Sequence, residues 1–314
     1  MTKQFVADLK NGDRVESLFV VASKNLVPYS NKSSKAGQFY LKLILKDKSG
    51  TIEGRIWDNA LYYDLQFEID DIVFVKGTVC KYNGLQITVH EIERVSIEEV
   101  EISDFIPTAE FDIDTMWEKL VQFINKIENP YINELLNKLF DNAFKGKFCA
   151  APGGKKIHHA YRGGLLEHTV EVASIAENLT HIFPDFLNKD LLIAGALLHD
   201  IGKTLEYDVE SLSFQKTLKG KLHGHLVLGR DILLKGISKI KNFPQELEDE
   251  LGHMILSHHG CREWGSPETP KTIEALALFH ADLTSARISQ AAGTRSPSNP
   301  KLIKIYEKFP FSSF

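Results

Sequence analysis

The sequence has few cysteines and no long apolar run. Its three cysteines, Cys80, Cys149 and Cys261, stand far apart, so neither a CxxC metal motif nor a disulfide framework is expected. This scarcity favours a reducing compartment, and we expect a cytoplasmic protein. No apolar run reaches the roughly 18 residues of a membrane-spanning helix, so no association with a membrane is expected. The first residues, MTKQFVADLKNGDRVES, lack the basic and apolar regions of a secretory signal.

The sequence also has fewer basic residues than acidic ones. Lysine and arginine number 37 against 42 aspartates and glutamates, which gives a formal net charge of −5 at pH 7. This balance argues against a protein that coats nucleic acid by bulk attraction, although a local basic groove remains compatible with it. Bound divalent cations would add positive charge that the count omits. The 314 residues are enough for about two domains.

The first 95 residues or so carry the pattern of an all-β domain. Short apolar runs alternate with tight turns at Lys48-Ser49-Gly50 and Tyr82-Asn83-Gly84. Asn-Gly between two apolar runs is a strong hairpin signal. Five short strands joined in this way favour a small closed barrel, which we place at 1–95. The expected strands are Val15–Ser23, Phe39–Lys46, Thr51–Trp57, Ile72–Cys80 and Leu85–Ile92.

The pattern then changes to a helical one. Residues 96–110 are acidic, contain Pro107 and are expected to form a linker. From Asp112 onward, apolar residues recur at the i, i+3, i+4 spacing of an amphipathic helix. We therefore expect a multi-domain protein whose second domain, 111–314, is all-α. Its helices are expected from Ile113, from Pro130, and over Gly164–Asn178, Asp190–His199, His225–Leu234, Gln245–Ser257 and Ile273–Gln290.

Histidine is distributed unevenly along the chain. Eleven of the twelve histidines lie between His158 and His280, where an even distribution would place about five. Histidine is the commonest metal ligand and the commonest general acid or base in proteins. The second domain is therefore the place to look for a catalytic or metal site.

Candidate ligands occur at the ends or in the middle of apolar helical segments. The run LLIAGALLHDIGK ends an apolar helix in His199-Asp200, and a buried aspartate needs an ionic partner or a metal. Taken alone, this pair could simply end a helix. Ionisable residues on several separate apolar helices, however, are typical of a site inside a helical bundle. The residues that share this placement are His168, His199, Asp200, His225, His258 and Asp282.

Residues beside these positions are candidates for substrate contacts. Lys203 could orient a phosphate oxygen or could be a solvated surface lysine, and we expect Asp200 and Lys203 to be the catalytic residues. His259 could replace His258 as a ligand or contact the substrate. Gly229, one turn after His225, would allow another helix to approach closely. Phosphate contacts are expected from the residues before the first ligand, His158, His159 and Arg162.

The order His…His-Asp…His…His…Asp resembles the HD-domain superfamily of metal-dependent phosphohydrolases, over His158 to Gln290. The resemblance implies that one metal is held by His168, His199, Asp200 and Asp282. It also implies that His225 and His258 hold a second metal, with Asp200 bridging the two. Imidazole and carboxylate ligands suit Mn²⁺, Fe²⁺, Co²⁺, Ni²⁺ or Zn²⁺ better than Mg²⁺. Metal-bound water supplies hydroxide near neutral pH, so no serine or cysteine nucleophile is required.

The barrel resembles the nucleic-acid-binding OB-fold over Gly12–Ile92. The resemblance is carried by the runs GDRV (12–15), FYL (39–41), DKSG (47–50), IWD (56–58), GTV (77–79) and YNG (82–84). Such a barrel offers aromatic rings for base stacking and basic side chains for phosphates. Strand alternation places Phe39 and Tyr40 on opposite faces, so only one of them can face the groove. The expected strand-binding residues are Tyr40, Trp57, Tyr82, Lys42, Arg55 and Lys81.

The combination of both domains, with the run HHAYRGGLLEHT (158–169), resembles the YhaM-type 3′→5′ exoribonucleases of Gram-positive bacteria over nearly the whole chain. This resemblance implies Mn²⁺-dependent removal of nucleotides from single-stranded RNA, with activity on single-stranded DNA as well. We expect two ions per chain. Whether the chain forms a homo-oligomer is left open. Two alternatives also stay open: a phosphodiesterase or nucleotidase for small nucleotides, and a non-catalytic nucleic-acid-binding factor. The barrel argues against the first alternative, and the complete ligand set argues against the second.

Overall fold

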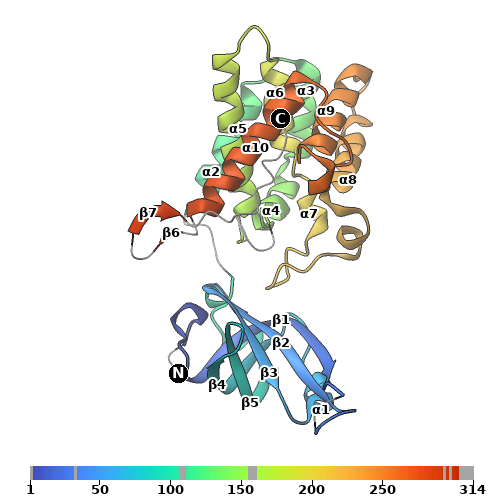
Figure 1. The fold of residues 1–314 in the computed structure, drawn as a ribbon. Coiled ribbons are helices and arrows are strands. Elements are labelled where there is room, and N and C mark those ends of the chain that lie inside the picture. The colour runs from blue at the N-terminus through green and yellow to red at the C-terminus, as the bar shows by residue number, and fades with distance from the viewer. Residues whose placement is uncertain are drawn as a thin grey trace. The chain divides into compact units, whose positions relative to one another are not determined.

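The computed structural model describes residues 3–31, 34–106, 111–154 and 161–292, with the backbone of 295–296 and 299–303. The chain divides into two compact units (Figure 1). The first unit comprises Met1–Thr108 and the short segment Glu210–Gln215, and the second comprises Ala109–Val209 and Lys216–Phe314. Each unit has a hydrophobic core of its own.

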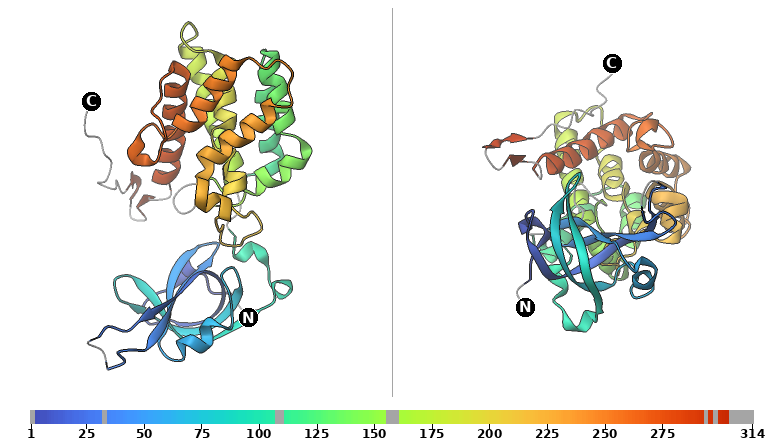
Figure 2. Two further views of the ribbon diagram at one scale, coloured as in Figure 1. Left: turned by 90° about the vertical axis from the view of Figure 1, so that its right-hand side faces the viewer. Right: turned by 60° about the horizontal axis from the view of Figure 1, so that its bottom comes forward.

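The first unit is a closed five-stranded barrel with the strand order β1-β2-β3-β5-β4. Strands β3 and β5 pair in parallel, and the other neighbours are antiparallel. Figure 2 shows the strands closing around the barrel interior. The predicted barrel is confirmed. Its elements are β1 (Arg14–Pro28), β2 (Phe39–Asp47), β3 (Gly50–Ile56), α1 (Ala60–Asp64), β4 (Ile72–Lys81) and β5 (Leu85–Val95), with short 3₁₀ turns at Val6–Asp8, Ile97–Glu99 and Ile102–Asp104.

Strand β1 is longer than predicted because it serves two neighbours. Its first half pairs with β4 and its second half pairs with β2. The register shifts between Val21 and Ser23, and a bulge of this kind bends a strand and increases its twist. Strand β2 shows the alternation that separates core from surface, since Leu41, Leu43 and Leu45 are fully buried while Lys42 points outward.

The second unit is a helical bundle. A side chain caps the first turn of several helices, as expected for aspartate, asparagine and threonine: Asp112 caps α2, Asn188 caps α6 and Thr217 caps α8. Two short helices, α4 and α7, were not predicted. The helices are α2 (Ile113–Asn125), α3 (Pro130–Leu139), α4 (Asn142–Ala150), α5 (Gly164–Ile182), α6 (Lys189–Leu198), α7 (Lys203–Glu206), α8 (Leu218–Ile237), α9 (Gln245–Ser257) and α10 (Ile273–Ala292), with a 3₁₀ turn at Arg262–Trp264.

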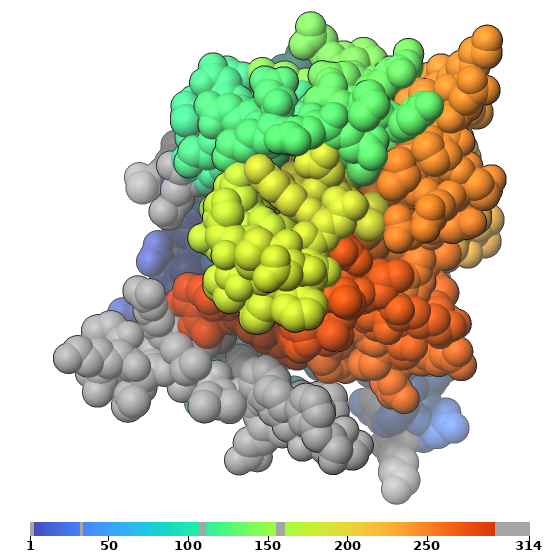
Figure 3. Space-filling model, turned by 90° about the horizontal axis from the view of Figure 1, so that it is seen from above, coloured from blue at the N-terminus to red at the C-terminus, as the bar shows by residue number. Residues whose placement is uncertain are grey.

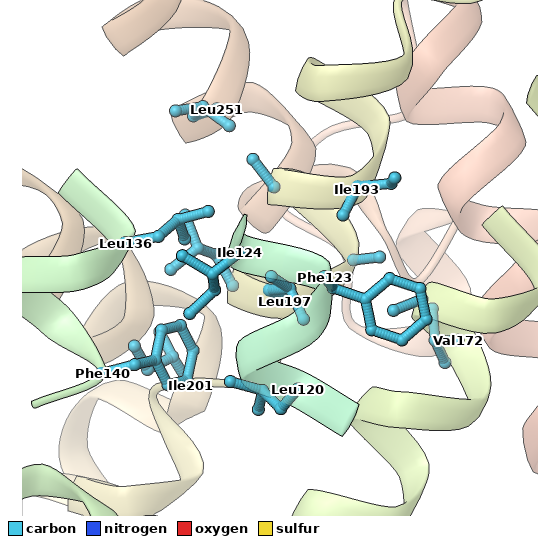
Figure 4. Close-up of a cluster of buried hydrophobic side chains, with 14 of the residues drawn as sticks. Leu120, Phe123, Ile124, Leu136, Phe140, Val172, Ile193, Leu197, Ile201 and Leu251 are labelled. Carbon is cyan, nitrogen blue, oxygen red and sulfur yellow. The ribbon is translucent and has the colours of Figure 1, made fainter. Parts of the chain in front are cut away.

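The bundle is organised around α6, whose residues from Leu191 to Leu198 are all buried. Helices α2, α3, α5, α9 and α10 pack around it. Figure 4 shows this core, where Leu120 and Phe123 of α2 meet Val172 of α5 and Leu197 of α6. Seen from above, α2 to α4, the α5–α6 connection and α9 to α10 form one continuous surface (Figure 3).

The second unit also contains a small amount of β structure. Strands β6 (Arg295–Ser296) and β7 (Asn299–Ile303) form an antiparallel pair, and a single bridge joins Tyr207 to Lys216. The expectation of an all-α domain therefore holds for the bundle but not for these segments. Within the described parts of the chain, no helix has the length and apolar character required to cross a membrane.

Candidate metal centre

The structure brings together the four residues predicted to hold the first ion. Helix α5 carries His168, the end of α6 leads into His199 and Asp200, and α10 carries Asp282. His168 Nε2 lies 3.0 Å from Asp282 Oδ1 and 3.2 Å from His199 Nε2. His199 Nε2 lies 3.4 Å from Asp200 Oδ2. His168, His199 and Asp200 are buried, so these groups face one another away from bulk water.

A second group forms beside the first. Helix α8 is interrupted at Gly224 (φ 70°, ψ 164°), and the regular helix after this break begins with His225. His225 Nε2 lies 3.4 Å and His258 Nε2 lies 3.6 Å from Asp200 Oδ1. His259 Nε2 lies 3.2 Å from His225 Nε2. Both His258 and His259 therefore lie in this group, and either imidazole could serve as a ligand.

Asp200 connects the two groups. Its Oδ2 faces His168 and His199, at 3.7 and 3.4 Å, while its Oδ1 faces His225 and His258. This is the arrangement expected of a carboxylate shared by two cations. The carboxylate is 2% exposed, and among the described residues Oδ1 has no hydrogen-bond partner. A buried oxygen of this kind carries a large desolvation cost unless a cation or a donor meets it.

In all five imidazoles, Nδ1 contacts an oxygen of the protein, and this contact fixes the orientation of the ring. Where that nitrogen meets a carbonyl or carboxylate, which can only accept, Nδ1 must carry the proton. In the neutral rings of His225 and His258, Nε2 is then an acceptor that faces Asp200 Oδ1, and a cation would resolve this conflict. The Nδ1 contacts are His168 to Ser285 Oγ (2.9 Å), His199 to Ala196 O (2.8 Å), His225 to Glu206 Oε2 (3.1 Å), His258 to Ile255 O (2.8 Å) and His259 to Trp264 O (3.2 Å).

The electrostatic environment favours the metal-binding protonation states. Burial lowers the pKa of His168 and of His258, and burial with the neighbouring histidines lowers the pKa of His259 to about 3. Burial raises the pKa of Asp200, but Lys203 and His199 outweigh it and hold the pKa well below its usual value. His199 differs, because Asp200 outweighs the effect of burial and raises its pKa. The carboxylate is therefore ionised, and His168, His258 and His259 are held in the neutral form that metal ligation requires.

Lys203 is part of the centre. It is 8% exposed, and its ammonium donates to Asp200 Oδ2 and to the backbone oxygen of Gly153. The interpretation as a solvated surface lysine is therefore excluded. Sequence reasoning missed Glu206, a buried carboxylate that contacts His225 and lies 2.7 Å from Lys216 Nζ. No spacing in the sequence marks Glu206 for this role.

Two glycines allow the elements of the centre to approach. A Cβ at Gly202 would lie 2.0 Å from the backbone oxygen of His225, which backbone packing does not permit. A Cβ at Gly229, the glycine singled out in the sequence, would lie 3.3 Å from Ile255 and 3.4 Å from the nitrogen of Gly202. Gly229 does lie at a close helix contact, but the packing depends more strictly on Gly202.

The centre opens into a cavity of about 220 Å³. Its polar wall is formed by residues already described, including Lys203, His259 and Asp282. Arg162 is exposed before α5 and is not among the described residues that line the cavity. His158 and His159 lie outside the described residues. The apolar wall consists of Trp264, Phe279, Leu283 and Ala286.

The barrel carries an aromatic cluster on its outer surface. The rings of Tyr40 and Trp57 lie 4.9 Å apart between centroids, and Tyr29, which sequence reasoning missed, lies 5.4 and 6.1 Å from them. The Arg55 guanidinium lies over Tyr40, Trp57 and Tyr82, at 5.7, 5.2 and 5.8 Å from the ring centroids. Aromatic rings around an arginine are suited to stacking with bases.

The basic residues near this cluster are partly neutralised. Lys42 pairs across the strands with Arg55, and Glu53 accepts from both, at 2.9 Å from Lys42 Nζ and 2.6 Å from Arg55 Nε. Lys81 is exposed at the end of β4. Phe39 is also exposed, but the ring that joins the cluster is that of Tyr40.

Comparisons with known families agree with this geometry. Residues 165–287 match the model of the HD domain, and residues 30–95 match that of an OB-fold nucleic acid binding domain. The chain is therefore a multi-domain protein in which an OB-fold precedes an HD domain. The two matches support a metal-dependent phosphohydrolase that acts on nucleic acid.

Solved structures resemble the barrel at low similarity. The second OB-fold domain of replication protein A from Methanococcus maripaludis is 24% identical, with a TM-score of 0.24, over 30% of this chain and 96% of that chain. A crystal structure of a domain of the same protein gives 22% identity and a TM-score of 0.25, over 30% and 97%. The OBody AM1L10 bound to hen egg-white lysozyme is 18% identical, with a TM-score of 0.24, over 31% of this chain and 95% of that chain. These values are too low to support a function.

Proposed function

We propose that the protein is a metal-dependent 3′→5′ exonuclease that hydrolyses the phosphodiester bonds of single-stranded RNA, and of single-stranded DNA as well. The observation that carries the proposal is the convergence of four imidazole Nε2 atoms, those of His168, His199, His225 and His258, on Asp200, whose Oδ1 has no hydrogen-bond partner among the described residues. The donor set of nitrogens and carboxylate oxygens fits a divalent transition metal, for which we propose Mn²⁺ with two ions per chain. The 3′→5′ polarity rests on the resemblance to the YhaM-type enzymes.

The chemistry follows from these residues. Divalent ions at such a centre activate water and stabilise the leaving oxygen of a phosphodiester. His168, His199 and Asp282 would hold one ion, His225, His258 and His259 the other, and Asp200 would bind both. The Lys203 ammonium lies at the cavity wall, fixed by Asp200, where it can bind a phosphate oxygen as the substrate enters.

The cavity and the aromatic cluster support a nucleic-acid substrate. The cavity of about 220 Å³ lies beside the ligands and offers space for part of a nucleotide at the metal centre. The aromatic cluster of the barrel supports a strand rather than a free nucleotide as substrate, because stacking and backbone charge are the means by which OB-folds bind single strands.

The test is to incubate the full chain with Mn²⁺ and a 5′-labelled single-stranded RNA. A ladder that shortens one nucleotide at a time from the 3′ end is expected, and Asp200→Ala should abolish it. Asp185→Ala, which removes an exposed aspartate of the same unit, is the control and should leave the ladder intact. Cleavage of small nucleotide diesters without any strand shortening would favour the small-nucleotide phosphodiesterase. Binding of RNA without any hydrolysis would favour the non-catalytic factor.

A further inference from the structure

The apolar wall of the cavity has no part in metal binding. Trp264 and Phe279 lie with their ring centroids 6.2 Å apart, and both line the cavity that contains Asp200 and Asp282. The side chain of Trp264 is not buried in the core, because 37% of the residue is exposed. An apolar wall of this kind next to a few charged groups is the usual lining of a ligand pocket.

Trp264 is held in place by the metal centre itself. His259 directs Nε2 to His225, while its Nδ1 donates to the backbone oxygen of Trp264 at 3.2 Å. Gly260 has a φ of +81°, and a Cβ at this position would lie 2.2 Å from the ring of Phe279. The segment between α9 and Trp264 is therefore packed tightly onto α10, which fixes the indole relative to the ligands.

A charged group lies beside the indole. The Arg287 guanidinium lies 5.9 Å from its ring centroid and also donates to Gln290 Oε1. The other side chains of the apolar wall, Phe279, Leu283 and Ala286, have no hydrogen-bonding groups. These apolar side chains can stack against the face of a planar ring but form no hydrogen bonds to the polar atoms at its edge.

We propose that Trp264 and Phe279 form a subsite for the nucleobase of the nucleotide whose phosphate lies at the metal centre. The inference rests on the proposed function and adds the part of the substrate that the ligands do not touch. The base stacks on the indole, as bases do on aromatic side chains of single-strand-binding proteins. Because the apolar side chains stack against the base and form no hydrogen bonds to its edge, they do not discriminate between bases, which suits removal of successive nucleotides.

The test compares two ligands that differ only in the base. Adenosine 5′-monophosphate and ribose 5-phosphate are titrated into the Mn²⁺-loaded full chain by calorimetry. Stacking predicts that the nucleotide binds at least about tenfold more tightly. Trp264→Ala should reduce this ratio to within about twofold, and Trp264→Phe should keep most of it. Phe186→Ala removes an exposed ring of the same unit that does not line the cavity, and should leave the ratio unchanged.

The inference is overturned if the wild-type ratio is close to one, or if Trp264→Ala leaves the ratio unchanged. If Trp264→Phe keeps the ratio while Trp264→Ala loses it, the loss in Trp264→Ala is due to lost stacking and not to misfolding. Hydrolysis of bis(p-nitrophenyl) phosphate by the wild type measures the metal centre independently. Hydrolysis with a ratio of one would reject the subsite and keep the proposed function. A ratio that depends on Trp264 without hydrolysis would keep the subsite and reject the proposed function.

Discussion

Asp200 is the residue on which both halves of the metal centre depend. Its two oxygens face different pairs of imidazoles, and the oxygen that faces His225 and His258 lacks a hydrogen-bond partner among the described residues. In the absence of a cation, Lys203 donates to the other oxygen, while this oxygen carries the desolvation cost of a buried acceptor without a hydrogen bond. A cation at the centre would offset that cost.

Asp200→Asn tests the role of this carboxylate through thermal stability. The amide removes the negative charge that pairs with the buried Lys203 ammonium, so the metal-free variant should be less stable than the metal-free wild type. Mn²⁺ at about a hundred times its dissociation constant should raise the wild-type Tm by about 5–10 °C, and the variant should show no such rise. Calorimetry with and without EDTA measures both effects, and Asp185→Asn is the matched control. An equal rise in Asp200→Asn would show that Asp200 does not bind the ion.

The residues of the centre were partly predictable from the sequence. His168, the His199-Asp200 pair and Asp282 stand out because they interrupt apolar helices, which needs only the period of the helix. Glu206 and Tyr29 could not be found in this way, since their contacts depend on how neighbouring elements pack, α7 against α8 and the end of β1 against β2. The ring orientation of His259 likewise depends on the backbone oxygen of Trp264, which no residue pattern encodes.

At the scale of elements, the approach of α7 to α8 sets the position of His225. Gly202→Ala should destabilise the protein by about 1–3 kcal/mol, because the new methyl group meets the backbone of His225. Gly229→Ala is the comparison and should cost less, since its neighbours lie at 3.3 and 3.4 Å and alanine favours the helix. Urea denaturation gives both values. The packing argument would be wrong if Gly229→Ala were the more destabilising change.

The outer face of the barrel offers a second prediction at this scale. Burial raises the pKa of Glu53, but Lys42 and Arg55 outweigh it and lower the pKa, so Glu53 is ionised at neutral pH. Glu53→Gln should release both cations for phosphates, giving several-fold tighter RNA binding and a steeper salt dependence. The control is Glu91→Gln, which removes the exposed carboxylate that pairs with Lys76 elsewhere on the barrel. Fluorescence anisotropy with labelled RNA measures the effect, and equal behaviour of the two variants would contradict it.

The elements that the sequence predicted well are those with a clear period. The five strands and the long helices follow from alternation and from the helical spacing, and the Asn83-Gly84 turn adopts the positive φ angles that its residues favour. Helices α1, α4 and α7 were missed because they are short. The helix predicted from His225 begins directly after the break at Gly224, and the part of α8 that was missed is the helical segment before the break, which starts at Leu218.

At the scale of the whole molecule, binding of single-stranded RNA and hydrolysis of a small phosphodiester should respond differently to salt concentration. If Lys42, Arg55 and Lys81 contact phosphates, the KM for a long single-stranded RNA should rise about tenfold or more between about 50 and 200 mM salt. The KM for bis(p-nitrophenyl) phosphate should change little, because this substrate does not require the barrel. Steady-state kinetics on the full chain measure both. A parallel rise for the two substrates would remove the assigned role of the barrel.

The claim on which the proposed function depends is that two carboxylates, Asp200 and Asp282, and five imidazoles hold two ions. The direct measurement is the metal content of the full chain, by plasma mass spectrometry, after equilibration with Mn²⁺ and removal of unbound ions. Two ions per chain are expected in the wild type and in His181→Ala, which removes an exposed histidine of α5. His225→Ala should fall to one. A wild type that holds no ion, or a His225→Ala variant that holds as many ions as the wild type, would contradict the two-ion centre.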